Sequence, residues 1–184
     1  MISPPIATLV SFTRRAFVTS SNSASIHSRY SPRKLKAFEQ GSFTPRERQL
    51  ILLAASVENH CNYCAAAHST VAKGALHTPA EVVSAIRNNT PVPDAKLNAL
   101  VTLVKELVRE GGYAKDETIQ KFIAVGYKKE QVMELLLGIA MKTISNYLDH
   151  ISPAPVDQAF AAESKQSIPF RKAADAAFQE RTKP

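Results

Sequence analysis

Apolar residues recur at intervals of three or four positions along most of the chain, and this spacing limits the fold more than any other feature. Such spacing places apolar side chains on one face of an α-helix, whereas a half-buried strand alternates with a period of two. No part of the sequence alternates with period two over a useful length. The sequence therefore predicts an all-α fold. The clearest apolar faces fall within residues 50–57, 97–107, 119–123 and 132–144.

Helix start signals stand before several of these faces. Thr44 is followed by Pro45 and Glu47, which predicts a capping threonine, a proline in the first turn and a glutamate that reaches back to the cap. Thr78 begins a second copy of the same pattern, and Asp94 is expected to cap a longer helix. The helical part of the chain is thereby divided into short segments, each with its own start.

The two cysteines of the chain lie within one short motif. We expect the first helix to be interrupted at Asn59 and a new helix to begin near Cys61, so that Cys61 and Cys64 share one helical face. A thiolate at a helix start gains from the helix dipole and from unpaired backbone N–H groups. His68 follows Cys64 by one helical turn and can carry a proton. Glu58 precedes Cys61 by three residues and is a candidate to lie near the pair.

A thiolate, a second thiol and a proton carrier are sufficient to reduce a peroxide. The thiolate attacks the peroxide and becomes a sulfenic acid, and the second thiol condenses with it to a disulfide. A chain whose only cysteines form one CxxC pair commonly uses it for redox chemistry or metal binding. A redox role indicates a reducing compartment, in which the disulfide forms and breaks during turnover.

Two other interpretations of the motif remain open at this stage. A structural zinc site needs four ligands, and Cys61, Cys64 and His68 supply three, with His60 as a strained fourth. Such a site would make the chain a zinc-bound structural module of an oligomer without catalytic activity. The second interpretation is a buried cysteine pair that takes part in no chemistry.

Three segments of the chain resemble one known family. The segment TPRERQLILLAASVENHCNYCAAAH, which begins at Thr44, looks like the signature of AhpD-like alkylhydroperoxidases in the carboxymuconolactone decarboxylase family. The later segments LNALVTLVKELV and KTISNYLDHI also resemble that family. The resemblance covers about residues 38–155, and its most specific part is the CxxC pair with a histidine four residues after the second cysteine.

The resemblance implies an AhpD-like helical fold that assembles as trimers or hexamers. It also implies reduction of hydroperoxides, with electrons from a thiol partner such as a lipoylated protein. Carried over to this sequence, Cys64 matches the peroxidatic cysteine, Cys61 the resolving cysteine and His68 the proton relay. The dipole argument favours the opposite assignment, because Cys61 lies nearer the helix start.

One position departs from the family pattern. Relatives with peroxidase chemistry often have a glutamate twelve residues before the first cysteine, and Gln49 stands there in this chain. We hypothesise that Glu58 takes over the role of this carboxylate, with Glu47 as the other candidate. The family has a second branch that decarboxylates a muconolactone without a CxxC pair. The presence of both cysteines favours the redox branch, and lactone decarboxylation is the alternative function.

Positive charge is concentrated at the N-terminus. Residues 1–38 contain six Lys or Arg and no Asp or Glu, whereas the remainder of the chain carries a net charge of only +1. This distribution does not indicate a nucleic-acid-binding surface on the domain. The basic, serine-rich segment resembles a mitochondrial transit peptide and is equally consistent with a solvated extension. We therefore expect a cytoplasmic protein, or a mitochondrial matrix protein if the segment is a transit peptide.

Other classes of protein find no support in the sequence. No apolar stretch approaches the roughly 20 residues of a membrane helix, and no glycine-rich phosphate loop indicates a nucleotide, so no membrane partner and no cofactor are expected. We divide the chain into an N-terminal extension (1–37), the AhpD-like domain (38–155) and a C-terminal helical extension (156–184). The last strong helix of the domain is predicted over about residues 129–150, and a weaker helical segment is expected after Ile168.

Overall fold

The computed structural model describes residues 36–151 and 155–166. Within these residues all regular structure is helical, which confirms the all-α fold. The expected segment after Ile168 and the proposed targeting segment lie outside the described residues. The elements in chain order are α3 (Pro45–Glu58), α4 (Asn62–Gly74), α5 (Ala80–Arg87), α6 (Ala95–Arg109), α7 (Asp116–Ala124), α8 (Gln131–Ile151), the 3-10 turn η1 (Gln158–Phe160) and α9 (Ala161–Ser164).

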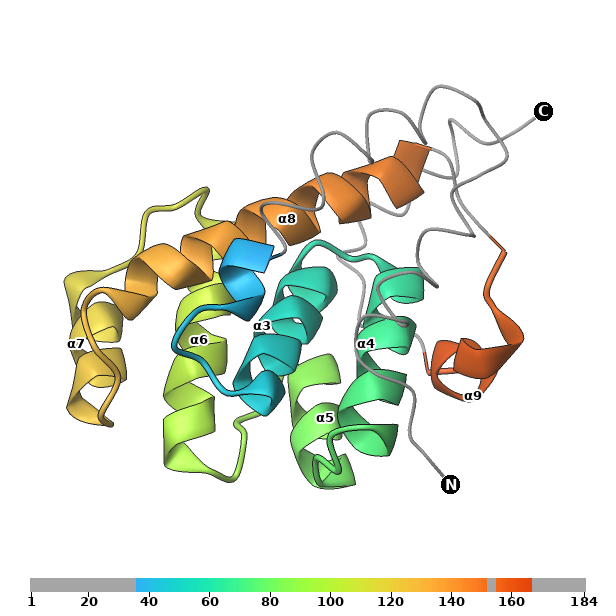
Figure 1. Ribbon diagram of the computed structural model, residues 1–184, viewed down its shortest axis with the longest axis horizontal. Helices are drawn as coiled ribbons and strands as arrows, with labels where there is room; N and C mark the ends of the chain where they lie inside the picture. Colours follow the sequence, from blue (N-terminus) through green and yellow to red (C-terminus); the bar gives the residue numbers. More distant parts are fainter. Residues whose placement is uncertain (1–35, 152–154, 167–184) are drawn as a thin grey trace.

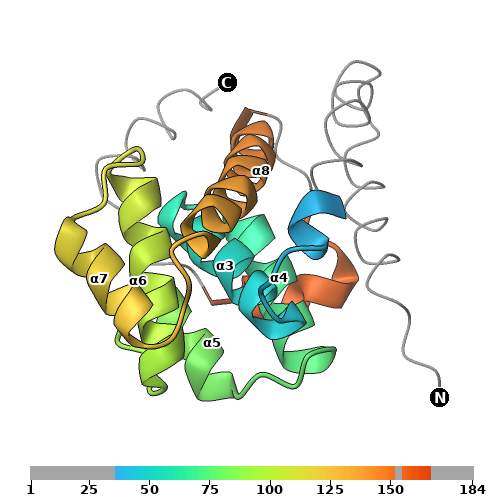
Figure 2. The ribbon, with the colours of Figure 1, turned by 60° about the vertical axis from the view of Figure 1, so that its left-hand side comes forward.

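Helix α3 is the centre of the bundle and packs against α4, α5, α6 and α8. Figure 1 shows α8 running across one end of the other helices, from beside α7 to beyond α4. Figure 2 shows α6 and α7 on one flank of α3 and α4 on the other. The core is fully buried where α3 meets its neighbours, and each such aliphatic side chain contributes roughly 1.5–3 kcal/mol of burial free energy. Its largest aliphatic members are Leu50, Ile51, Leu53, Ile86, Leu100, Leu103 and Leu135.

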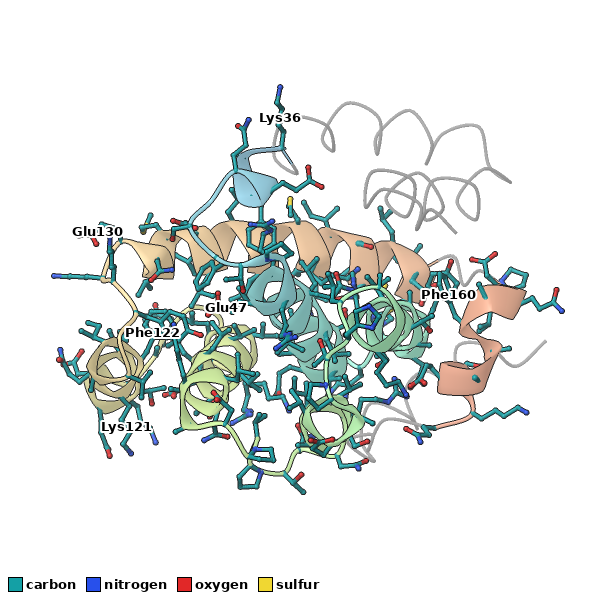
Figure 3. All side chains as sticks on the ribbon, turned by 60° about the horizontal axis from the view of Figure 1, so that its bottom comes forward. Lys36, Glu47, Lys121, Phe122, Glu130 and Phe160 are labelled. Carbon is teal, nitrogen blue, oxygen red and sulfur yellow. The ribbon has the colours of Figure 1, made fainter. Side chains whose placement is uncertain are left out.

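The start of α3 has the capping box that the sequence predicts. The Thr44 hydroxyl accepts from the backbone N–H of Glu47, and the Glu47 carboxylate accepts from the Thr44 N–H at 2.8 Å. That carboxylate also accepts from the Tyr127 hydroxyl at 2.8 Å, and Lys96 Nζ lies 3.8 Å from it. Figure 3 shows Glu47 among the helices rather than on the surface. Every partner of this buried acid serves the fold.

The predicted break after α3 is also present. Asn59 caps the C-terminus of α3, and His60 has a left-handed backbone with φ of +59°. The Asn59 amide donates to Asn146 Oδ1 at 3.1 Å and to Thr143 Oγ1 at 3.3 Å, both on α8. The connection from α3 to α4 is therefore fastened to α8, and this contact determines where Cys61 lies.

The second predicted capping signal forms differently. Helix α5 does follow, but its N-cap is Pro79 and no side chain caps it. Thr78 is buried, and its hydroxyl has no hydrogen-bond partner among the described residues. The reason lies in the turn through His77 (φ +48°), in which the Thr78 N–H donates to Ala72 O at 2.8 Å. The third signal forms as expected, since Asp94 accepts from the Leu97 N–H at 2.7 Å.

Candidate active site

The two cysteines meet at the start of α4. Cys61 is the N-cap residue, and its sulfur accepts from the backbone N–H of Cys64 at 3.4 Å. Both are free thiols, and both are buried in a small apolar cluster that also contains Tyr63 and Phe160. A helix begins at this point because the left-handed His60 ends the preceding turn and gives the chain a new direction. The sequence predicts this arrangement of Cys61 and Cys64.

A polar row on α8 faces the cysteines, and sequence reasoning missed it. Lys142, Ser145, Asn146 and Asp149 are spaced as neighbours on one helical face. Lys142, Asn146 and Asp149 are buried, although such groups are normally found at the surface. Two charged residues, Lys142 and Asp149, at the spacing of the buried stripe of α8 were the signal that could have revealed this row.

Cys61 lies against the acidic end of this row. Its thiol donates to Asp149 Oδ2 at 3.3 Å. The side-chain contact with Cys64, burial, the negative charge of Cys64 and then that of Asp149 raise the pKa of the Cys61 thiol, against a smaller opposing effect of Lys142. Cys61 therefore holds its proton at neutral pH.

Cys64 lies near the basic end of the row. Its sulfur is 3.9 Å from Ser145 Oγ, and Lys142 Nζ donates to the same hydroxyl at 3.4 Å. The side-chain contact with Cys61, the positive charge of Lys142 and the Ser145 hydroxyl lower the pKa of Cys64 to about 6, against the effects of burial and Asp149. Cys64 is thus mainly a thiolate at neutral pH. At Cys64 the effect of Lys142 exceeds that of Asp149, and at Cys61 the reverse holds, so these two charges favour ionisation of Cys64 over Cys61.

His68 is held by Gln49. The side-chain Nε2 of Gln49 lies 2.7 Å from His68 Nδ1 and 3.2 Å from the His68 carbonyl oxygen. Because a carbonyl only accepts, the Gln49 atom must be the amide nitrogen, and its second hydrogen points to Nδ1. Burial, with a smaller contribution from the Lys142 charge, moves the pKa of His68 well below its usual value. His68 is therefore neutral, with its proton on Nε2.

Glu58 does not join this group. Its carboxylate accepts from Arg109 Nε at 2.8 Å and from Arg109 Nη2 at 3.3 Å, so it pairs with α6. The hypothesis that Glu58 orients His68 is corrected by these contacts. The sequence distance from Glu58 to Cys61 is short, but the end of α3 directs the two side chains toward different helices. Gln49 is the residue that orients the histidine.

A strap formed by residues 157–166 closes the site on the outer side of α4. Tyr63 donates to Asp157 Oδ2 at 2.6 Å, and the Phe160 ring packs edge-on against Tyr63 at a centroid distance of 6.0 Å. Glu163 pairs with Lys73, and its carbonyl accepts from Arg87 at 3.0 Å. Figure 3 shows Phe160 on the side of the strap that faces the bundle. The strap was not predicted, because its contacts are all distant in sequence.

The remaining expectations about the site concern metals and membranes. Among the described residues, no three His, Cys, Asp or Glu side chains gather in a way that could hold a metal ion. The zinc-bound alternative therefore receives no support from this geometry. None of the helices in residues 36–151 and 155–166 is long and apolar enough to cross a membrane.

Comparisons with known proteins agree with the fold. The sequence model of the carboxymuconolactone decarboxylase family matches residues 33–106, which include both cysteines and His68 but not the polar row of α8. No curated protein matches the chain. The crystal structure of the debrominase Bmp8, in a cysteine-to-alanine variant complexed with 2,3,4-tribromopyrrole, is similar with a TM-score of 0.61 and 16% identity. That similarity covers 72% of this chain and 71% of the debrominase, and at this identity it concerns the fold alone.

Proposed function

We propose that this chain, whose residues 33–106 match the model of the carboxymuconolactone decarboxylase family, is a thiol-dependent peroxidase that reduces hydroperoxides. The observation that carries the proposal is the unequal surroundings of the two cysteines: the Cys61 thiol donates to Asp149, whereas the Cys64 sulfur lies beside Ser145, which Lys142 contacts. Cys64 has a pKa of about 6 beside Lys142, while Cys61 retains its proton beside Asp149. A nucleophilic thiolate next to a protonated thiol is the starting state that a two-cysteine peroxidase requires.

The reaction proceeds in two steps at these sulfurs. The Cys64 thiolate attacks the terminal oxygen of the hydroperoxide, the O–O bond breaks, and Cys64 becomes a sulfenic acid as an alkoxide leaves. The alkoxide takes up from solvent the proton that Cys64 lost on ionising, and it departs as an alcohol. The Cys61 thiol then attacks the Cys64 sulfur, the S–O bond breaks, and the departing hydroxide combines with the proton lost by Cys61 to form water. A dithiol reductant returns the disulfide to two thiols.

His68 assists the first step. It lies one helical turn beyond Cys64, and both residues feel the Lys142 charge. The His68 Nε2–H is the donor available to the departing alkoxide oxygen, because Gln49 occupies Nδ1. Donation to developing negative charge lowers the barrier to O–O cleavage.

Partners and location are part of the same proposal. The reductant is a small dithiol or a lipoylated protein, and the chain functions as a homo-oligomer, either a trimer or a hexamer. Its compartment is the cytoplasm, or the mitochondrial matrix if residues 1–37 act as a transit peptide. These statements follow from the family resemblance and from the charge of the N-terminal segment.

Peroxide consumption with dihydrolipoamide as the reductant tests the proposal. Cys64→Ser should reduce consumption to the level seen without protein, because it removes the nucleophile. Lys121→Gln is the control, since Lys121 is exposed on α7 and pairs only with Glu117 among the described residues. Full activity in Cys64→Ser would exclude the peroxidase. Lactone decarboxylation that survives loss of both cysteines would instead support the alternative function.

Thiol titration provides a second check that needs no reductant. One equivalent of peroxide should reduce the count of titratable thiols from two per chain to none, because Cys61 and Cys64 are the only cysteines and lie beside each other. Mass spectrometry should then show the two residues joined within one chain. Persistence of both thiols would contradict the redox cycle.

A further inference from the structure

We infer that α8 assigns the two cysteines their roles: Asp149 is the base that takes the Cys61 proton during disulfide formation, and Lys142 is a positioning residue that selects Cys64 as the nucleophile. The inference rests on the proposed peroxidase function and deepens it. It adds two residues outside the matched segment 33–106 to the site.

The contact between Cys61 and Asp149 supports the first assignment. The thiol hydrogen bond to Asp149 Oδ2, at 3.3 Å, is already aligned for proton transfer from sulfur to oxygen. Both groups are buried, so bulk water has little access to the thiol proton. The charged and titratable groups acting on Cys61 are Cys64, Asp149 and Lys142. Of these three groups, Cys64 is the sulfur under attack and Lys142 is a cation. Asp149 is therefore the group that can accept the Cys61 proton.

The position of Lys142 supports the second assignment. Its ammonium donates to Ser145 Oγ, which lies against the Cys64 sulfur. The helix start by itself favours ionisation of Cys61, whose sulfur accepts the Cys64 N–H. A carboxylate beside Cys61 and a cation near Cys64 reverse that preference. One helix therefore sets the order of the two chemical steps by placing opposite charges about two turns apart.

The proton balance of the second step identifies what Asp149 must do. Attack of Cys61 on the Cys64 sulfenic acid forms the S–S bond, breaks the S–O bond and releases hydroxide. The Cys61 proton moves to the Asp149 carboxylate and is then transferred to the hydroxide, which leaves as water. Asp149 ends the step as a carboxylate, and no further oxidant or reductant is required. Without this base, Cys61 would have to attack as a neutral thiol, which is a poor nucleophile.

Asp149→Asn tests the base directly, because asparagine keeps the size of the side chain but cannot take up the proton. After a single addition of hydrogen peroxide, disulfide formation should slow by about 10²–10⁴-fold. The Cys64 sulfenic acid should persist and be trapped by dimedone. Asp94→Asn is the matched control, because Asp94 caps α6 and asparagine caps a helix equally well. Disulfide formation at the wild-type rate in Asp149→Asn would overturn the assignment.

The pH dependence of alkylation tests the selection of Cys64 in the unmodified protein. Site-resolved mass spectrometry after iodoacetamide treatment gives one titration midpoint for each cysteine, and the midpoint reports ionisation independently of access. We expect Cys64 to have the lower midpoint, and Lys142→Met to raise it. A lower midpoint for Cys61 would overturn the inference even if the variants fail to fold. Failure of the peroxidase itself would appear differently, as a wild-type protein that forms no sulfenic acid or disulfide with peroxide.

Discussion

Two buried carboxylates, Glu47 in the first turn of α3 and Asp149 near the end of α8, have different surroundings. Glu47 receives hydrogen bonds from Thr44 and Tyr127 and has the Lys96 ammonium nearby. Asp149 instead faces the thiol of Cys61. A carboxylate whose partners are hydrogen-bond donors and a cation stabilises the fold. A carboxylate that accepts a hydrogen bond from a titratable thiol can exchange a proton with it. Both carboxylates are buried, so burial alone does not identify a catalytic acid. The chemical nature of the groups that contact the carboxylate identifies it.

The largest expected effect tests whether the histidine works without a carboxylate of its own. His68→Ala should lower peroxidase turnover by about 10²–10⁴-fold, because the departing oxygen loses its donor. Gln49 contacts His68 through an amide, so no carboxylate orients this histidine. The acid that we assign to the site, Asp149, contacts the Cys61 sulfur instead. Steady-state turnover with dihydrolipoamide measures the effect. Turnover within a factor of two of wild type would show that another group donates to the departing oxygen.

The next effect falls on stability rather than on chemistry. Glu47→Gln should lower the free energy of unfolding by about 1–3 kcal/mol, because it weakens hydrogen bonds to a charged group. Turnover should remain at the wild-type level. Thermal unfolding and peroxide consumption measured on one sample separate the two effects. A Glu47→Gln protein that melts normally but is inactive would show that Glu47, and not Asp149, belongs to the site.

The pH dependence of stability sharpens this result. Burial raises the pKa of Glu47, but hydrogen bonds from Thr44 and Tyr127 and the Lys96 charge together lower it below its usual 4.5. A depressed pKa stabilises the fold above the unfolded-state value, and this contribution disappears as the pH falls through the lower folded-state value. The difference in stability between wild type and Glu47→Gln should therefore shrink below about pH 4.5. A constant difference from pH 7 to pH 3 would contradict the assignment.

Features encoded locally could be predicted from the sequence, and features that depend on distant partners could not. The Thr44–Glu47 box, the Asp94 cap and the break at Asn59 each depend on neighbours within four residues, so the sequence pattern predicted them. Thr78 has the same pattern, but the preceding turn through His77 makes Pro79 the cap.

The residues of the candidate site also fall into those that local spacing predicts and those that depend on distant partners. The positions of Cys61, Cys64 and His68 on α4 follow from their spacing. The contact between Cys61 and Asp149 spans 88 residues, and the contact between Tyr63 and Asp157 spans 94. No local rule predicts which helix faces a cysteine, so the charges that distinguish the two thiols became visible only with α8 in place.

The smallest expected effect concerns Glu58, the acid that lies closest to the CxxC motif in sequence. Its carboxylate accepts two hydrogen bonds from Arg109; the Glu58 side chain is 10% exposed and that of Arg109 is 41% exposed. Solvent reaches the arginine and screens the pair, and ion pairs screened in this way contribute about 0–1 kcal/mol to stability. Glu58→Gln should therefore lower the unfolding free energy by less than ~1 kcal/mol and leave turnover unchanged. The same measurements on Arg109→Gln provide the matched control, because both variants remove one pair. If Glu58→Gln lowers turnover at least tenfold while Arg109→Gln does not, Glu58 leaves its arginine during the reaction and a second carboxylate serves the site. Equal, small effects in both variants would leave Asp149 as the acid of the site and place Glu58 with Glu47 among the acids that stabilise the fold.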